Sequence, residues 1–129
     1  MNGTVAELLL DTDVFVDHLR GARRLTLGEE QVAYSVVTRC ELFAGRQGEE
    51  SRVAELLEPF VEIPVDRGVA EMAGRFRRCH RVRIADALIG ATAHQHGLTL
   101  VTRNVRDFEA IPNLRVRLPV PNGSDGIGS

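Results

Sequence analysis

Lysine and tryptophan are both missing from this chain of 129 residues, and all 16 of its basic residues are arginine. Every mechanism that requires a lysine is therefore excluded. Aromatic residues make up only 5% of the chain, so stacking against unpaired bases is not an obvious means of recognising a nucleic acid. The formal net charge of −2 likewise gives no signal for nucleic-acid binding over the whole chain.

Long apolar runs and cysteine-rich motifs are missing too. No uncharged apolar run approaches the ~20 residues that a membrane span needs, and Glu7 and Asp11 come too early for a signal peptide. We therefore expect a cytoplasmic protein without membrane contact. The two cysteines, Cys40 and Cys79, match no zinc-binding spacing, so we expect both to be reduced thiols.

The composition, with 43% hydrophobic and 26% charged residues, is typical of one globular domain. Short apolar segments alternate with helical patterns along it, which predicts an α/β fold with a parallel sheet and helices on both faces. Strands are predicted over residues 6–10, 32–37, 61–65, 98–102 and, at a sheet edge, 114–118. Helices are predicted over residues 13–19, 38–47, 51–60, 66–80 and 84–96, with one helical turn over 104–108. Residues 119–129 are rich in Pro, Gly and Ser and are predicted to be a disordered tail, which leaves 1–118 as the domain.

Four acidic residues fall near the strand ends where ligands bind in open α/β sheets. Asp11 ends the first strand, and Asp107 follows the last clear one. Glu41 and Asp86 lie on the helices after the second strand and before residues 98–102. Carboxylates that converge without a partner repel one another, so such a group normally means a bound cation, and its hard oxygen ligands favour Mg²⁺ or Mn²⁺ over zinc.

Each acid also has a purely structural interpretation. Asp11 and Asp13 are good helix N-caps, with Asp13 the better placed for the first helix. Thr38 and Glu41 match the capping box S/T-x-x-E, in which the glutamate bonds back to its own helix. Asp86 suits the first turn of a helix without any function, and Asp107 lies three residues after a possible cap. Four independent caps at these four junctions is the weaker joint explanation.

Three segments resemble the motifs of the PIN-domain ribonucleases, above all the VapC-type toxins of bacterial toxin–antitoxin pairs. They are LLLDTDVFVDHL, TRCELFAG and IADALIGATAHQHGLTLVTRNVRDF, and the resemblance extends over about residues 7–118. It implies a PIN-like three-layer α/β/α sandwich with a central, mostly parallel sheet of four to five short strands. It also implies a metal-dependent endoribonuclease that cleaves phosphodiester bonds in structured cellular RNA.

The resemblance assigns roles to individual residues. Asp11, Glu41 and Asp86 match the three central acids that hold Mg²⁺ or Mn²⁺. The fourth polar position varies between the sites of Asn104 and Asp107, and the acid is the better candidate here. The resemblance further implies a partner, a VapB-type antitoxin whose C-terminal segment covers the active site, and a homodimer. Supporting roles, in orienting a ligand or the substrate, fall to Asp13, Thr102 and Asn104.

Arginines cluster between residues 67 and 83, where six of them accompany a single acid, Glu71. On general grounds this is a solvated helix end, but beside a metal site it is a plausible phosphate-binding surface. The arginines that we expect to contact RNA are Arg75, Arg78, Arg81 and Arg83.

Three other functional classes were considered. The run from Leu8 to Asp17 superficially resembles the D-x-D motif of haloacid-dehalogenase phosphatases, but these, like response-regulator receivers, are expected to use a lysine that this chain lacks. A zinc site at Cys79, His80, His94 and His96 is disfavoured because His94 and His96 are two positions apart on a helix. A catalytically inactive PIN scaffold that binds RNA or protein is the remaining alternative.

Overall fold

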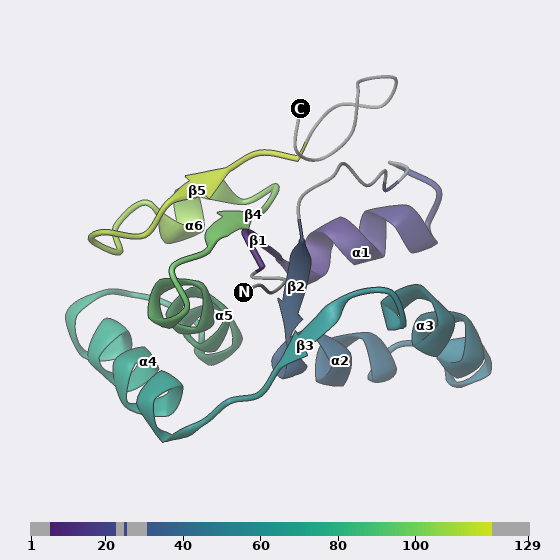
Figure 1. Cartoon of the computed structure of the whole chain (residues 1–129), viewed down its shortest axis with the longest axis horizontal. Coiled ribbons are helices and arrows are strands. Elements are labelled where there is room, and N and C mark those ends of the chain that lie inside the picture. The colour runs from purple at the N-terminus through teal and green to yellow at the C-terminus, as the bar shows by residue number, and fades with distance from the viewer. Residues whose placement is uncertain (1–5, 23–24, 26–30, 120–129) are drawn as a thin grey trace, which may run out of the picture.

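The computed structural model describes residues 6–22, 25 and 31–119 and places a five-stranded, fully parallel sheet at the centre (Figure 1). The strand order is β3-β2-β1-β4-β5, so the first strand along the chain is the middle one. The strands are β1 (Leu8–Leu10), β2 (Val32–Ser35), β3 (Val61–Ile63), β4 (Thr99–Val101) and β5 (Val116–Arg117). All five lie within the predicted segments, and β5 is an edge strand as expected.

The helices also follow the prediction in number and place. They are α1 (Thr12–Leu19), α2 (Val36–Phe43), α3 (Glu50–Leu57), α4 (Arg67–Cys79), α5 (Ile84–Gln95) and α6 (Val105–Phe108), with a 3-10 turn η1 (Gln47–Glu49) before α3. Asp66, the first residue of a predicted helix, caps α4 through its side chain, and Gly97 follows α5 with a φ of 67°. Helix α3 ends two residues before Pro59, which has no backbone N–H to continue the helical hydrogen bonds, and Glu58 between them keeps helical backbone angles.

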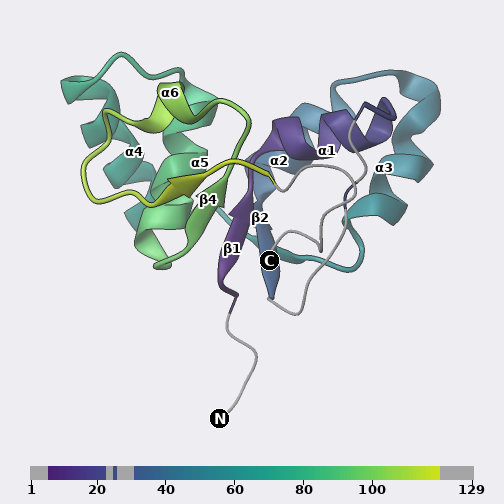
Figure 2. The same ribbon diagram turned by 90° about the horizontal axis from the view of Figure 1, so that it is seen from above.

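Side chains on the central strands alternate between two apolar cores. Leu9 of β1 packs in the core under α4 and α5, whereas Leu8 and Leu10 pack in the core formed with α1 and α3. Ala33 and Tyr34 of β2 divide between the same two cores. Figure 2 shows the result, with α4, α5 and α6 on one side of the sheet and α1, α2 and α3 on the other. The predicted three-layer α/β/α sandwich is confirmed.

Two predicted helix starts are wrong. Helix α1 is capped by Asp11, which accepts a hydrogen bond from the Thr12 backbone amide, and Asp13 lies inside its first turn. Helix α2 begins at Val36 rather than Thr38, because the Ser35 hydroxyl accepts from the Val37 amide and caps the helix earlier. The β-branched pair at 36 and 37 has strand propensity, and this local cap overrides it.

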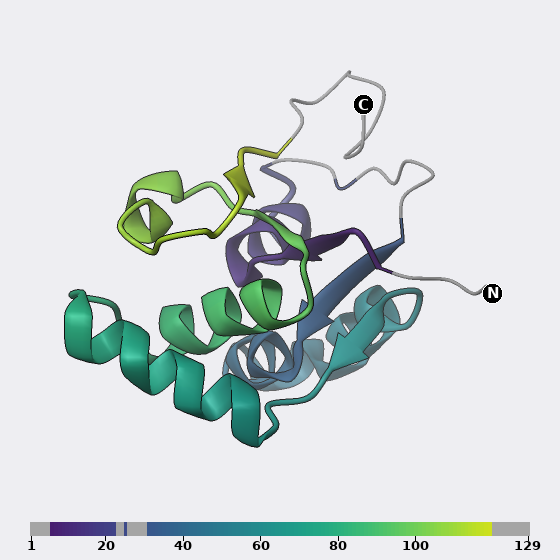
Figure 3. The same cartoon turned by 60° about the vertical axis from the view of Figure 1, so that its left-hand side comes forward.

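Helices α4 and α5 run side by side as an antiparallel hairpin over one face of the sheet (Figure 3). Their connection brings the end of α4 close to the start of α5, where Asp86 is located. Within the described ranges, no helix is long and apolar enough to cross a membrane. The predicted tail lies outside the described residues except for Pro119, which is buried.

The strand order determines where a site can form. From β1 the chain moves outward through β2 and β3, and later returns to place β4 and β5 on the other side of β1. The direction of winding therefore reverses between β1 and β4, and ligands in open α/β sheets bind in the crevice beyond the carboxyl ends of such strands. Asp11 follows β1 and Thr102 follows β4, so both lie at this crevice.

Candidate active site

Asp11 is the most buried acid of the crevice, with 5% of its surface exposed. One carboxylate oxygen accepts from the Thr12 amide at 2.8 Å and the other from the Thr102 hydroxyl at 2.7 Å. Burial raises the pKa of Asp11 to about 7, and the neighbouring Asp13 and Asp86 charges add to the shift. Asp11 is therefore both the cap of α1 and a carboxylate that lacks a compensating cation.

Asp13 faces the segment that follows β4. Its Oδ2 accepts from the Arg103 backbone amide at 3.1 Å and from the Asn104 side-chain amide at 3.0 Å, and the Thr102 hydroxyl lies 3.2 Å away. Its Oδ1 is buried and has no hydrogen-bond partner among the described residues. Burial raises the pKa of Asp13, although the hydrogen bond from the Arg103 backbone amide opposes the shift. Asp13 therefore joins α1 to the β4–α6 segment.

Glu41 bonds to another helix and not to its own. Its Oε1 accepts from the Thr12 hydroxyl at 2.5 Å, and the Thr12 and Thr38 hydroxyl oxygens are 2.9 Å apart. Because Thr12 has only one hydroxyl hydrogen, Thr38 is the donor of that second bond. The capping-box alternative is wrong, because Thr38 lies within α2 and Ser35 is the cap. Glu41 is directed toward Asp11's end of α1.

Asp86 lies in the first turn of α5, half-buried. Burial raises its pKa, and the charges of Asp107 and Glu41 raise it further, while Arg83 lowers it. Asp86 also contributes to the raised pKa of Asp11. The structure thus brings the predicted acids close enough to perturb one another's ionisation. Asp107 itself is exposed, in the first turn of α6.

These acids fit a hard divalent cation by the chemistry of their donors. All of them offer carboxylate oxygens, and the buried Asp13 Oδ1 has no other partner among the described residues. Among the described residues, Arg83 is the cation that opposes the raised pKa of Asp86. The arrangement is not closed, however, since within the described part of the chain no three His, Cys, Asp or Glu side chains converge as a metal-binding group. The ligand type therefore suits a hard divalent cation, although the described acids do not form a complete set of ligands.

An ion pair that the sequence did not suggest joins α1 to the segment after β4, next to Asp13. Asp17 of α1 is buried, with 6% of its side chain exposed, and Arg103 bonds to it at 3.0 Å. The same guanidinium lies 3.9 Å from Asp13. Thr12 was missed as well, although it separates the two aspartates of the D-T-D motif. The one sequence signal for Asp17 is its position four residues after Asp13, which puts both acids on one helix face.

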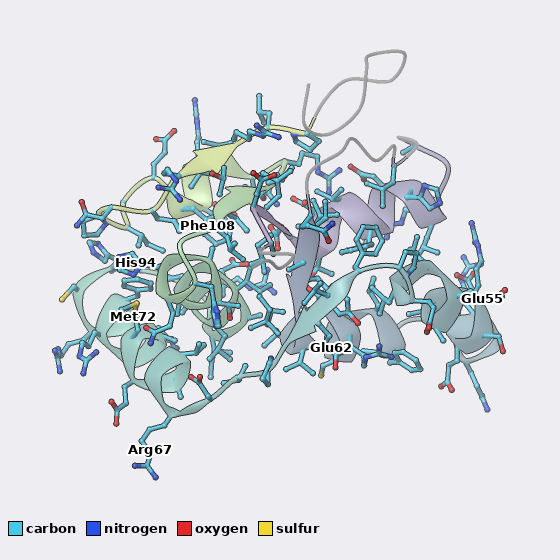
Figure 4. The ribbon with its side chains drawn as sticks, in the orientation of Figure 1. Glu55, Glu62, Arg67, Met72, His94 and Phe108 are labelled. Carbon is cyan, nitrogen blue, oxygen red and sulfur yellow. The ribbon has the colours of Figure 1, made fainter. Side chains whose placement is uncertain are left out.

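The arginines predicted to bind RNA do not form one group. Arg83 lies near Asp86, and Arg81 is in the same short connection between α4 and α5. Arg75 lies about one turn before the end of α4, and its guanidinium Nη2 is 3.9 Å from Glu71 Oε1. His94, from the disfavoured zinc set, lies between α4 and α5 near Met72 (Figure 4), and its ring packs against Phe76 edge to face.

Comparisons with known proteins agree with this fold. The family profile named PIN domain matches residues 8–114. Two curated relatives from Mycobacterium tuberculosis (strain ATCC 25618 / H37Rv) are each 37% identical: Ribonuclease VapC10, covering 88% of this chain and 95% of its own length, and Ribonuclease VapC19, covering 83% and 96%. A solved toxin–antitoxin complex from Klebsiella pneumoniae matches with a TM-score of 0.70 and 31% identity, over 84% of this chain and 95% of the other. This chain therefore belongs to the PIN-domain family.

Proposed function

We propose that this protein is a metal-dependent endoribonuclease and the toxin of a toxin–antitoxin pair. The observation that carries the proposal is the position of Asp11, Glu41 and Asp86. The Asp86 charge raises the pKa of Asp11, the Glu41 charge raises the pKa of Asp86, and Glu41 accepts a hydrogen bond from Thr12, the residue that follows Asp11. The chain's 37% identity to two ribonucleases supports the same activity. The nuclease domain in this proposal comprises residues 1–118.

Asp11, Glu41 and Asp86 would hold Mg²⁺ or Mn²⁺, with Asp107 as the fourth acid. The ion would supply a water of lowered pKa and neutralise the charge on the departing oxygen of a phosphodiester. Thr12 holds Glu41 through its hydroxyl, and Thr102 holds Asp11 in the same way. Asp13 and Asn104 fix the segment after β4 against α1. These contacts limit side-chain rotation, which keeps the carboxylates directed to the crevice before substrate arrives.

The RNA backbone would approach over the connection between α4 and α5. Arg83 is already within electrostatic reach of Asp86, and Arg81 is two residues away. A guanidinium binds phosphate through two parallel N–H groups, so these side chains would position a phosphodiester beside the acids. Arg78 lies on the last turn of α4 and belongs to the same surface, whereas Arg75 contributes least because Glu71 lies beside it.

The proposed partner is a VapB-type antitoxin that covers the acidic crevice, and the active assembly would be a homodimer that the antitoxin converts to a hetero-oligomer. The Klebsiella pneumoniae structure is a toxin–antitoxin complex, which supports this partnership for a chain of the same fold and 31% identity. An inactive scaffold is not favoured by any contact in the structure.

The test is cleavage of purified RNA by the full chain with Mg²⁺ or Mn²⁺, with EDTA, and with the Asp86→Asn variant. We expect cleavage that requires the ion and falls by at least about 10²-fold in the variant. Cleavage that persists in EDTA would show that the activity does not require a divalent ion. Absence of cleavage under all metal conditions, from folded protein, would leave the inactive scaffold as the better interpretation.

A further inference from the structure

A pocket of about 570 Å³ opens beside the acidic crevice, between the end of α1, the end of α2 and the η1–α3 segment. Its volume falls in the range of pockets that take a small ligand. Glu41 forms part of its wall, so the pocket and the crevice share a boundary residue. Glu41 is the one proposed site acid among the described residues that line the pocket.

Three arginines line this pocket: Arg20, Arg46 and Arg52. Arg52 is held in place, because its guanidinium donates to the Leu19 backbone carbonyl at 2.8 Å and so ties α3 to the end of α1. Glu49 lies 3.9 Å from both Arg46 and Arg52, a separation too long for a hydrogen bond. Among the described residues the pocket is lined by two carboxylates, Glu41 and Glu49, and by three guanidiniums, and neither contact of Glu49 is a hydrogen bond.

Val16, Leu19, Leu42 and Gly45 make up the apolar part of the wall. None of the described residues that line the pocket is aromatic, so they offer a base no ring to stack on. A phosphate, by contrast, would find bidentate donors with a fixed geometry. The lining thus suits a nucleotide unit held mainly through its phosphate.

We propose that this pocket binds a backbone phosphate of the RNA substrate. That phosphate and the phosphate held by the α4–α5 arginines would lie on opposite sides of the scissile bond. The inference rests on the proposed ribonuclease function and adds a subsite that the sequence did not indicate, because Arg20, Arg46 and Arg52 are scattered over three segments. Strands of RNA would then cross the acids between two arginine groups, one near Arg83 and one in the pocket.

The experiment measures binding of a short, labelled, single-stranded RNA of mixed sequence to the full chain carrying Asp86→Asn, over a range of salt concentrations. Arg46→Gln and Arg52→Gln should each weaken binding by about 3–10-fold and reduce the slope of log affinity against log salt by about 0.7. Arg46 is the safer variant for folding, because 89% of its side chain is exposed. Arg67→Gln is the matched control, since Arg67 lies at the far end of α4 and points away from the molecule (Figure 4).

A variant that is expected to strengthen RNA binding shows that the losses above do not come from a damaged fold. Glu49→Gln removes the acid that competes with phosphate for the two arginines, so it should strengthen RNA binding by about 2–3-fold. In the active enzyme, Arg46→Gln should raise KM for RNA with little change in kcat, because the contact is made equally in the ground state and the transition state.

These measurements distinguish failure of the phosphate subsite from failure of the proposed ribonuclease function. If the parent binds RNA and the pocket variants match Arg67→Gln in affinity and salt slope, the phosphate subsite is wrong and the ribonuclease stands. If the pocket variants lose only affinity for an antitoxin peptide, the pocket is a protein-binding site and the proposal is overturned. If the folded parent neither binds nor cleaves RNA, the proposed function fails and the subsite fails with it.

Discussion

A single hydroxyl hydrogen decides how the two aspartates of the D-T-D motif share their surroundings. The Thr102 hydroxyl lies 2.7 Å from Asp11 and 3.2 Å from Asp13, yet it has one hydrogen to donate. The shorter distance assigns that hydrogen to Asp11, so Asp13 depends on the Arg103 and Asn104 amides. Neither carboxylate gains a full set of donors, which is consistent with the raised pKa of both.

Removing the Asp11 charge should stabilise the metal-free protein at high pH. The pKa of Asp11 is about 7 in the folded chain against an ordinary value of 3.8, so between these pH values the folded state binds a proton that the unfolded state has lost. Stability from this group therefore falls as pH rises from about 4 to about 7. Asp11→Asn should raise the free energy of unfolding by about 1–2 kcal/mol at pH 8, since the amide avoids the charge but offers one acceptor fewer.

Urea denaturation in EDTA at pH 5 and pH 8 measures this effect. The gain should shrink or reverse at pH 5, where the wild-type carboxyl is protonated in the folded state. Asp66→Asn changes the cap of α4 and is the matched control, because asparagine caps a helix as well as aspartate. A loss of stability in Asp11→Asn at pH 8 would show that hydrogen bonding outweighs desolvation at this position.

Glu41→Gln should separate charge from hydrogen bonding. The glutamine Oε1 can still accept from the Thr12 hydroxyl, so we expect a Tm close to that of the wild type. A metal ligand, however, loses its charge, and RNA cleavage should fall by at least about 10²-fold. Glu55→Gln on the exposed surface of α3 is the control and should leave both quantities unchanged. Cleavage within a few-fold of wild type would reduce Glu41 to a structural residue.

At the scale of elements, α1 and the β4–α6 segment are held together by an ion pair between the buried Asp17 and the half-exposed Arg103. Arg103 is half-exposed and Asp17 is almost fully buried, so Arg103→Gln leaves a buried carboxylate without its partner. We expect a loss of about 1–3 kcal/mol in unfolding free energy. Cleavage should fall by about tenfold, because Thr102 and Asn104 then lose their fixed position beside Asp11 and Asp13.

A double-mutant cycle with Asp17→Asn tests whether the pair acts as a unit. The neutral amide does not need a cation, so the double variant should be more stable than the sum of the two single changes predicts. Arg106→Gln alters the next exposed arginine of the same segment and serves as the control. Additive effects within about 0.5 kcal/mol would mean that Arg103 and Asp17 stabilise the fold independently.

The same elements show what the sequence could and could not predict. Short apolar segments predicted all five strands. The signal is clearest for β1, β2 and β4, which are buried in the middle of the sheet, whereas the edge strands β3 and β5 are partly exposed. The start of α2 was misplaced, since two cap signals, Ser35 and Thr38, lie close together and local sequence does not rank them. Glu41 bonds to Thr12 beside Asp11, but the binding of one ion by all the predicted acids stays a prediction. The Arg103–Asp17 pair joins positions 86 residues apart, and no local pattern reports such a contact.

At the scale of the whole molecule, the reversal of strand order gathers acids from distant segments at the middle of the sheet. Asp11, Glu41 and Asp86 come from three helices or their caps, and only the folded chain brings them together. An ion that needs all three binds the native state and not the unfolded chain. Its binding free energy then adds to global stability, by RT ln(1 + [ion]/Kd).

Mn²⁺ should therefore raise the Tm of the wild-type chain, and more at pH 8 than at pH 6. A proton on Asp11, whose pKa is about 7, competes with the ion, so the apparent Kd should be about tenfold weaker at pH 6. Thermal unfolding at a series of Mn²⁺ concentrations gives this Kd at each pH. Asp86→Asn should lose most of the stabilisation, whereas Glu55→Gln should keep it. Equal stabilisation of Asp86→Asn and wild type would place the ion among surface acids, because a site at the β1–β4 crevice cannot lose the Asp86 carboxylate without losing affinity.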